Sequence, residues 1–84
     1  MTPFWPQGES IVVTTQGDAP ASFHWEHRAH RVQGVSAHWR VHTAWWTEGE
    51  VWRDYWEVTT DTGLLCVLYH DLIGGAWYLE RIYE

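Results

Sequence analysis

The stretch "RDYWEVTTDTGLLCVLYHD" (53–71) decides the fold, because it has the pattern of two β-strands joined by a tight turn. Its central residues "DTG" (61–63) fit a type I turn that ends with a glycine in the left-handed conformation. We therefore expect Thr60 to pair with Leu64 across the turn, so that the numbers of paired residues sum to 124. This sum predicts the partner of every residue in the hairpin.

The register also assigns each ring of the hairpin to a face, because successive side chains of a strand point to opposite sides of the sheet. On one face it places Tyr55 opposite Tyr69. On the other face it places Trp56 opposite Leu68. The hairpin therefore predicts aromatic rings on both sides of its sheet.

Further strands are predicted before and after this hairpin. Downstream, "DLIGGA" (71–76) predicts a turn and "WYLERIY" (77–83) a returning strand, and the length of the turn leaves their register open. The strands expected upstream are "SIVVTT" (10–15), "ASFHWEH" (21–27) and "HRVQGVSAHWRVHTAWW" (30–46). The last of these is one long strand or two strands with a bend near Gly34, and a helix is the competing prediction for it.

The predicted architecture is all-β: a single small antiparallel meander of five or six strands, forming a curled sheet or a small SH3-like barrel. Closure is favoured because it removes the exposed edges of so short a sheet. Residues 10–84 form the expected β domain, and a chain of 84 residues is long enough for one domain and not for two. Residues 1–9, rich in proline and glycine, form an expected N-terminal arm that Phe4 and Trp5 pin to the body or to a neighbour.

The chain carries a net charge of −6, and its five basic residues are all arginine. Residues 45–84 hold two arginines against eight acids, whereas residues 1–44 hold three of each. The C-terminal half would therefore repel a phosphate backbone, and any contact with nucleic acid would come from the region between His24 and His42. No apolar stretch is long enough for a membrane span and no signal peptide is evident, so a cytoplasmic location is expected.

Adjacent aromatic residues raise the main functional question. The pairs Trp45–Trp46, Tyr55–Trp56 and Trp77–Tyr78 cannot each place both rings in one core, because neighbours on a strand point to opposite faces. The second aromatic surface is covered by the N-terminal arm or by loops, or it is a self-association interface, or it binds another protein or nucleic-acid bases. The predicted partner-binding residues are Trp45, Tyr55, Tyr69, Trp77, Arg28, Arg31 and Arg40.

Catalytic, metal and cofactor chemistry are not expected from this sequence. The three histidines of residues 24–30 are spaced by three, so on a strand they alternate between faces, and we expect surface histidines and no metal site. Asp54 and His70 are expected to form a cross-strand hydrogen bond or ion pair, because no serine or cysteine is placed to act as their nucleophile. Cys66 stands alone in an apolar run and is expected in the core.

Four segments carry a family resemblance: "FHWEHRAHRV" (23–32), "HWRVHTAWW" (38–46), "RDYWEVTTDTG" (53–63) and "LYHDLIGGAWYLERIYE" (68–84). Together they resemble an uncharacterised bacterial family of small β-domains. They also resemble the C-terminal segment of ImuB-type proteins, the polymerase-like subunits of a DNA-damage-induced mutagenesis complex, or mutasome. In ImuB-type proteins this region is associated with protein–protein contacts, so the resemblance implies an interaction role and no defined catalytic residues.

The expected function is therefore that of a non-enzymatic protein-interaction module. Through the resemblance, the expected setting is bacterial DNA-damage tolerance by translesion synthesis, and the expected partner is a DNA-repair or mutasome subunit. Two alternatives stay open: binding of single-stranded nucleic acid by aromatic stacking, which the net charge of −6 disfavours, and a homodimer with an aromatic interface. No membrane partner is expected.

Overall fold

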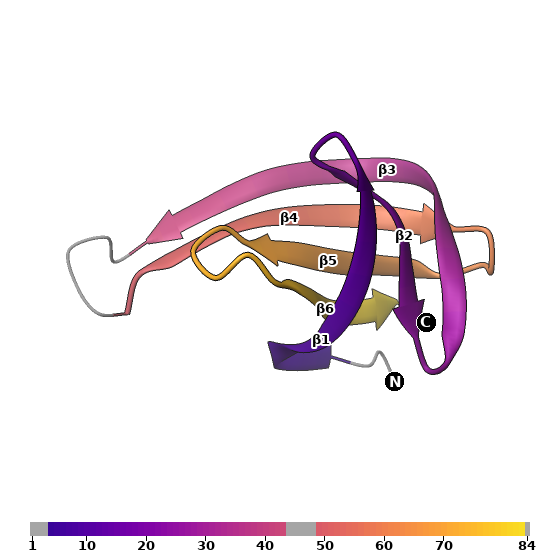
Figure 1. The fold of residues 1–84 in the computed structure, drawn as a ribbon, viewed down its shortest axis with the longest axis horizontal. Helices are drawn as coiled ribbons and strands as arrows, with labels where there is room; N and C mark the ends of the chain where they lie inside the picture. Colours follow the sequence, from indigo (N-terminus) through magenta and orange to yellow (C-terminus); the bar gives the residue numbers. More distant parts are fainter. Residues whose placement is uncertain (1–3, 44–48, 84) are drawn as a thin grey trace.

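Six strands follow one another in chain order around a closed barrel, and each pairs antiparallel with its neighbours (Figure 1). The computed structural model describes residues 4–43 and 49–83. The strands are β1 (Phe4–Gln16), β2 (Ala19–Trp25), β3 (Arg28–Thr43), β4 (Val51–Thr60), β5 (Leu65–Asp71) and β6 (Trp77–Tyr83). The predicted all-β antiparallel meander is confirmed, and β6 closes the barrel by pairing with β1.

The strand β3 joins two layers of the barrel. Its first residues pair with β2, and its later residues pair with β4. Figure 1 shows β3 turning between these two parts, so that β1 and β2 run across the direction of β4 and β5. The pairing with β4 shifts register between Val32 and Gly34 and again between Val35 and Ala37. The predicted alternative of one long strand is therefore confirmed for the described residues, with irregular pairing around Gly34, and the competing helix is wrong there.

The hairpin of β4 and β5 has the predicted register, because every pair between the two strands has residue numbers that sum to 124. The turn closes with a hydrogen bond of 3.0 Å from the amide of Thr60 to the carbonyl oxygen of Leu64. Gly63 has φ 89°, the left-handed conformation that the turn requires. Local turn chemistry is thus enough to align this half of the barrel.

The strand β1 begins earlier than predicted, and this corrects the expected arm over residues 1–9. The strand starts at Phe4, which pairs with Arg81 of β6. The register between β1 and β6 shifts between Phe4 and Glu9, where Gly8 adopts a left-handed φ of 75°. The shift lets an irregular, glycine-containing segment remain beside β6. The described part of the predicted arm is therefore barrel wall.

Aromatic contacts fasten this segment, as the sequence predicted for Phe4 and Trp5. The guanidinium carbon of Arg81 lies 4.5 Å from the centre of the Phe4 ring. Trp5 packs edge-on against Trp25 of β2, with 6.1 Å between ring centres. The indole nitrogen of Trp25 donates a hydrogen bond of 3.1 Å to the carboxylate of Glu9. The start of β1 is thus tied to both β6 and β2.

One apolar cluster fills the barrel. Its buried members are Phe23, Trp56, Val58, Cys66, Leu68, Trp77, Leu79 and Ile82. Cys66 is a core residue, as predicted, and burial raises the pKa of its thiol to about 12. The thiol is therefore protonated at neutral pH and a poor nucleophile. Among the described residues there is no helix with the length and apolar character that crossing a bilayer requires.

Candidate interaction surface

The β3–β4 ribbon begins in the barrel and extends beyond it. We define it as residues 37–43 of β3 and 51–57 of β4, which pair in one uninterrupted register. The neighbouring strand β5 follows β4 only as far as the pair of Arg53 with Asp71, so the outer end of the ribbon has two strands. Figure 1 shows this end projecting past the other strands. Both faces of the projecting end are therefore available to solvent or to a partner.

The two faces of the ribbon carry different side chains, because alternate residues point to opposite sides. The inner face continues the side of the sheet that lines the barrel. Its cross-strand pairs are His38–Trp56, Arg40–Asp54 and His42–Trp52. The pairs of the outer face are Ala37–Glu57, Trp39–Tyr55 and Val41–Arg53. Aromatic rings thus occur on both faces.

Histidine rings stack on tryptophan rings along the inner face and its continuation onto β5 and β6. The stacked pairs, with the distances between ring centres, are His38–Trp56 at 3.6 Å, His70–Trp77 at 4.6 Å and His42–Trp52 at 5.0 Å. Trp56 and Trp77 belong to the barrel core, whereas Trp52, near the projecting end, keeps 37% of its surface exposed. The inner face therefore passes from core to solvent along the ribbon.

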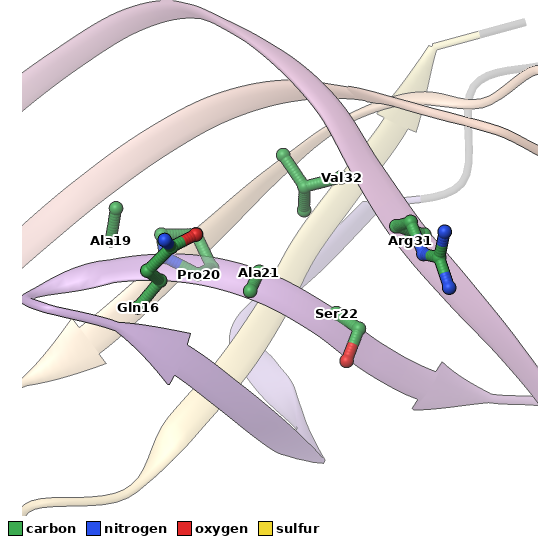
Figure 2. A pocket seen from close by; sticks show the side chains of 7 residues that line it. All are labelled: Gln16, Ala19, Pro20, Ala21, Ser22, Arg31 and Val32. Carbon is green, nitrogen blue, oxygen red and sulfur yellow. The ribbon is translucent and has the colours of Figure 1, made fainter.

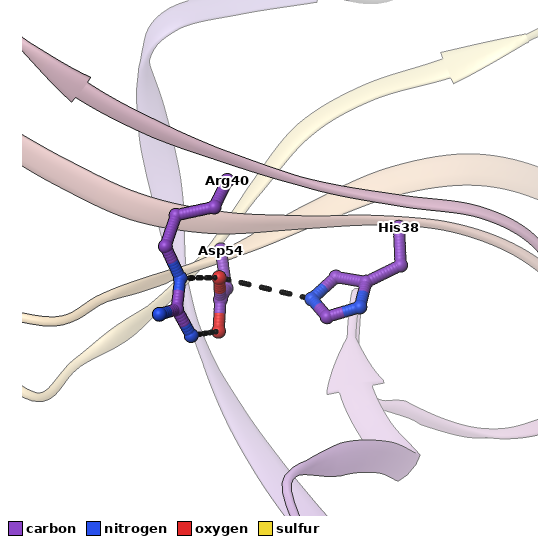
Figure 3. Close-up of polar contacts among 3 residues, drawn as sticks. All are labelled: His38, Arg40 and Asp54. Atoms are coloured by element: carbon purple, nitrogen blue, oxygen red, sulfur yellow. Dashed lines mark hydrogen bonds and ion pairs between the residues drawn. The ribbon is translucent and has the colours of Figure 1, made fainter.

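A charged pair sits in the middle of this inner face (Figure 3). Arg40 donates two hydrogen bonds to the carboxylate of Asp54, from Nε at 2.6 Å and from Nη2 at 3.0 Å. The imidazole of His38 approaches from the other side, with Nε2 3.7 Å from Oδ1 of Asp54. The hydrogen bonding from Arg40 lowers the pKa of Asp54 although burial opposes this, so the carboxylate is ionised at neutral pH. The pair fixes the head of Arg40 on the ribbon.

The predicted side-chain contact between Asp54 and His70 is replaced by other partners. The two residues are opposite each other in the backbone pairing, as expected. The carboxylate of Asp54 instead binds Arg40, and Nε2 of His70 donates a hydrogen bond of 3.2 Å to the carbonyl oxygen of Gly75. An aspartate already bound to arginine is poorly suited to orient a histidine for proton transfer.

The predicted outward rings Tyr55 and Tyr69 lie on the expected face but are buried, with exposed fractions of 9% and 2%. Trp39 covers Tyr55 in a parallel stack with 5.3 Å between ring centres. The guanidinium carbon of Arg53 lies 4.4 Å from the centre of the Tyr69 ring, and the backbone of Gly8 in β1 packs against the same ring. The prediction that these two rings are exposed contact area is therefore wrong. The N-terminal segment helps to cover them, which was one of the three expected explanations.

The prediction that Trp77 points outward is also wrong. Trp77 pairs with His70 and belongs to the barrel core, so Tyr78 is the outward member of that adjacent pair. The pairing of β5 with β6 includes a register shift between Val67 and Leu68 that the sequence pattern does not reveal. Trp45, the remaining predicted ring, lies outside the described residues.

The exposed tryptophans of the ribbon are Trp39 and Trp52, which the sequence pattern did not single out. They keep 40% and 37% of their surfaces exposed and lie on opposite faces. Their pairing with Tyr55 and His42 is the signal that could have found them. Recognising these pairs requires the register of β3 with β4. The sequence does not show this register, because the pairing around Gly34 is irregular.

The three predicted arginines are exposed and all lie on β3, but they do not gather around the tyrosines. Arg40 lies on the ribbon. Arg28 and Arg31 lie in the part of β3 that pairs with β2, and neither has an ion-pair partner among the described residues. The strand β3 contains no acidic residue. Basic charge therefore follows a single strand in a chain whose net charge is −6.

A pocket of about 430 Å³ lies where β3 separates from β2. The pairing of β2 with β3 stops at Ser22 and Arg31, so the earlier residues of β2 border open space on that side. Figure 2 shows the lining side chains, which come from the end of β1, from β2 and from β3: Gln16, Ala19, Pro20, Ala21, Ser22, Arg31 and Val32. Small side chains keep the pocket open, and Arg31 is the charged residue of its lining.

The histidines of residues 24–30 do not all lie on the surface, which corrects that expectation. His30 is 5% exposed and stacks on Phe23, with 5.2 Å between ring centres. Its Nδ1 atom lies 2.6 Å from the hydroxyl oxygen of Thr62. In the described part of the chain, no group of three histidine, cysteine, aspartate or glutamate side chains is arranged to hold a metal ion.

Comparison with known proteins identifies a family and no individual relative. No curated protein and no solved structure matches the chain at a significant level. Residues 6–84 match the family described as "Domain of unknown function (DUF6504)". This range includes all of the ribbon, the charged pair of Arg40 with Asp54 and the pocket between β2 and β3. The chain therefore belongs to the DUF6504 family of uncharacterised domains.

Proposed function

We propose that this domain is a non-enzymatic protein-interaction module whose partner binds the β3–β4 ribbon. The observation that carries the proposal is the exposure of Trp39 and Trp52 on opposite faces of the β3–β4 ribbon. Tryptophan, tyrosine and arginine are the residues that contribute most often to the affinity of protein interfaces. Arg40 follows Trp39 on β3, so the ribbon presents an aromatic side chain on its outer face and a basic side chain on its inner face.

The contact groups of the ribbon are held in place without a partner. Trp39 and Trp52 each stack on a ring of the paired strand. Arg40 is held by two hydrogen bonds to Asp54. Side chains that are already ordered lose little conformational entropy on binding, which favours affinity. This arrangement supports a preformed contact surface.

The proposal of a non-enzymatic role is supported by the state of the reactive groups. The thiol of Cys66 is buried and its pKa is raised to about 12, so the thiolate needed for nucleophilic attack is scarce at neutral pH. The carboxylate of Asp54 is engaged by Arg40, which lowers its pKa and makes it a weak general base. Both groups have structural roles that need no catalytic explanation.

The proposed setting is bacterial DNA-damage tolerance in the cytoplasm, with a subunit of a translesion-synthesis complex as the partner. This part of the proposal rests on the resemblance of segments such as "RDYWEVTTDTG" (53–63) to the C-terminal segment of ImuB-type proteins. In those proteins the segment is associated with contacts between mutasome subunits. The ribbon would supply the corresponding contact here.

The test is a binding measurement with purified components. The domain is immobilised and exposed to each polymerase and accessory subunit of a bacterial mutasome, and affinity is measured by biolayer interferometry. We expect one subunit to bind, and we expect Trp39→Ala with Trp52→Ala to weaken binding by about tenfold or more. Val12→Ala is the matched control, because Val12 is an exposed apolar residue of β1 away from the ribbon.

Two results would contradict the proposal separately. Unchanged affinity of the folded double variant for a bound subunit would remove the ribbon from the interface. Absence of binding to every subunit would remove the mutasome setting. Circular dichroism and urea denaturation of each variant establish that a loss of affinity is not a loss of folding.

Single-stranded nucleic acid is the second candidate ligand. Strand β3 favours it, because this strand carries the exposed Trp39 and contains no acidic residue. Stacking of bases on exposed rings is worth about 1–3 kcal/mol per base. The net charge of −6 opposes binding to phosphates. A tryptophan fluorescence titration with an oligonucleotide at low salt separates the two ideas, because we expect no quenching at micromolar concentrations.

Self-association through the ribbon is the third candidate, because the same exposed rings could meet in a second copy. Light scattering over a range of protein concentrations tests it directly. We expect the mass of a monomer at all concentrations, and a dimer that disappears in the Trp39→Ala variant would assign the ribbon to self-association.

A further inference from the structure

The longest unpaired backbone edge in the described part of the chain belongs to β3. Residues 28–31 of β3 pair with β2 on one side. From residue 32 to residue 43, β3 pairs with β4 on the other side, and none of the described strands pairs with its first side. In an antiparallel strand, the backbone N–H and C=O groups of alternate residues point to each side. Half of these groups along residues 32–43 therefore face away from β4.

The outer part of this edge lacks two usual barriers to strand addition. Natural edge strands are protected by proline, by bulges or by charged side chains. Residues 37–43 contain no proline, and their pairing with β4 has no register shift, so the edge is regular there. The charge of Arg40 is turned onto Asp54 across the ribbon, where it forms two hydrogen bonds. The edge over residues 37–43 is therefore regular enough to pair with a further strand.

The pocket between β2 and β3 provides a place for one end of an added strand. It lies at the fork where β3 leaves β2, which is where the free edge of β3 begins (Figure 2). Ala19, Ala21 and Val32 give it an apolar lining, and Arg31 adds a positive charge. Pro20 has no N–H group to offer, so β2 presents a weaker edge at the fork than β3 does. A side chain of a strand added to β3 would enter this space.

The charge of β3 indicates which kind of segment could bind to its free edge. The strand carries three arginines and no acid, and the side chains of Arg28 and Arg31 are exposed with no ion-pair partner in the described residues. A second copy of this chain adding through its own β3 would place two basic strands side by side, which like charges disfavour. An acidic segment would instead gain a favourable contact with Arg31, where the free edge of β3 begins.

We propose that the free edge of β3, with the pocket at its fork from β2, binds an acidic, extended peptide segment of a partner protein as an additional β-strand. This inference rests on the proposed interaction function and specifies how its partner is held. Backbone hydrogen bonds to residues 37–43 supply affinity. Acidic side chains near Arg31, with the charge of Arg28 farther along β3, supply selectivity. The exposed ring of Trp39 lies on a strand next to the bound segment and adds apolar contact.

The probe is a decapeptide selected from a random display library against the complete chain and then synthesised with a fluorescent label. We expect selected peptides to be enriched in aspartate and glutamate alternating with β-branched residues. We expect Arg31→Glu with Arg28→Glu to weaken anisotropy-measured affinity by at least tenfold, and Arg81→Glu, a matched charge reversal on β6, to leave it within about twofold. A lysine version of the peptide should bind the double variant better than the native chain.

Amide hydrogen exchange supplies the signature that separates strand addition from loose charge attraction. On binding the peptide, alternate amides of residues 37–43 should gain protection, because only those facing away from β4 acquire a new partner. Uniform or absent protection would overturn the proposal, as would selected peptides that lack acids or protect another strand. Displacement of the peptide by an oligonucleotide at equal concentration would also overturn it, in favour of nucleic acid.

Failure of this inference and failure of the proposed function give different results. If a mutasome subunit binds and depends on Trp39 and Trp52, but the peptide experiments fail, the ribbon is an interface without strand addition. If neither the subunit nor a peptide binds, both ideas are overturned. Protection of alternate amides of residues 37–43 in concentrated protein without peptide would identify a second copy as the occupant and overturn the acidic segment.

Discussion

The barrel and the β3–β4 ribbon use the same residue type for different purposes. Inside the barrel, Trp56 at the inner end of the ribbon and Trp77 of β6 each keep only 8% of their surface exposed. On the ribbon, Trp39 and Trp52 keep 40% and 37% exposed. A ring inside the barrel contributes its full apolar area to folding, whereas a ring on the ribbon retains area for another molecule. The number of tryptophans in a small domain therefore does not measure the size of its core.

The difference follows from the number of strands around each ring. A barrel strand has a neighbour on both sides and a filled interior on one face, so its inward side chains are enclosed. Trp52 lies at the outer end of the ribbon, which has two strands, and Trp39 lies on β3 where the described strands pair with it on one side only. Substitutions in the barrel should therefore lower stability more than partner affinity, and substitutions of the exposed ribbon tryptophans should lower partner affinity more than stability.

The largest effect is expected from a cavity in the barrel. Leu68→Ala removes a fully buried side chain of β5 and should lower the free energy of unfolding by about 2–5 kcal/mol. Leu65→Ala, on the same strand but 36% exposed, is the control and should cost about 1 kcal/mol or less. Urea denaturation followed by tryptophan fluorescence measures both. Equal losses would contradict the assignment of the barrel as the main source of stability.

Gly8→Ala tests the barrel wall where β1 crosses the tyrosines. Gly8 has φ 75°, and an added Cβ would lie 2.6 Å from the hydroxyl of Tyr69 and 2.7 Å from the Cβ of Tyr78. Gly17 has a similar φ of 63°, but an added Cβ there would meet no atom within 4 Å. A left-handed alanine alone costs about 1–2 kcal/mol. Gly8→Ala should therefore be more destabilising than Gly17→Ala, and equal melting temperatures would show that β1 does not press on the rings.

The charged pair of the ribbon should give a pH-dependent contribution to stability. Arg40 lowers the pKa of Asp54 in the folded chain, so the ionised pair stabilises folding above the unfolded pKa of about 3.9 and stops doing so as pH falls through the folded value. Asp54→Asn should be less stable than the native chain at pH 7, by less than the Leu68→Ala variant. The gap should narrow below about pH 4.

Chemical denaturation at a series of pH values measures this gap. Arg40→Gln serves as the matched variant, because it removes the other half of the same pair and should show the same narrowing. A gap that stays constant from pH 7 to pH 3 would show that the carboxylate adds nothing through its charge.

The smallest effect on folding is expected from the exposed ring of the ribbon. Trp52→Ala removes a ring that contacts solvent on one side and His42 on the other, and an aromatic pair of this kind is worth about 1 kcal/mol. Partner affinity should nevertheless fall far more than stability does. If Trp52→Ala unfolds the chain as strongly as Leu68→Ala does, the ribbon is part of the core and the comparison between the two regions fails.

Local chemistry made the β4–β5 hairpin predictable to the residue. The turn at residues 61–63 sets the register, and alternation then places Tyr55 and Tyr69 on one face and Trp56 on the other, all as observed. Beyond residue 70 the register could not be predicted in the same way, because the longer loop over residues 71–76 allowed more than one pairing. The position of Trp77 in the core therefore came from the structure.

The candidate site was less predictable than the fold. Arg40 was identified from the sequence, but its partner Asp54 and the exposed Trp39 depend on the register of β3 with β4. The irregular pairing around Gly34 determines that register, and bulges leave no reliable mark in a hydrophobic pattern. The open edge of β3 was equally hidden, because it exists only where β2 and β3 diverge.

The sequence by itself determined that the chain is all-β, which rings share a face in the first hairpin, and that Cys66 is internal, because turn geometry and side-chain alternation act between near neighbours. Only the tertiary structure decided which faces meet water. Gly8, far from Tyr69 in the chain, lies against its ring, whereas nothing among the described residues covers the end of the ribbon in the same way. Burial depends on what a distant segment places over a face, and the residues of that face do not encode it.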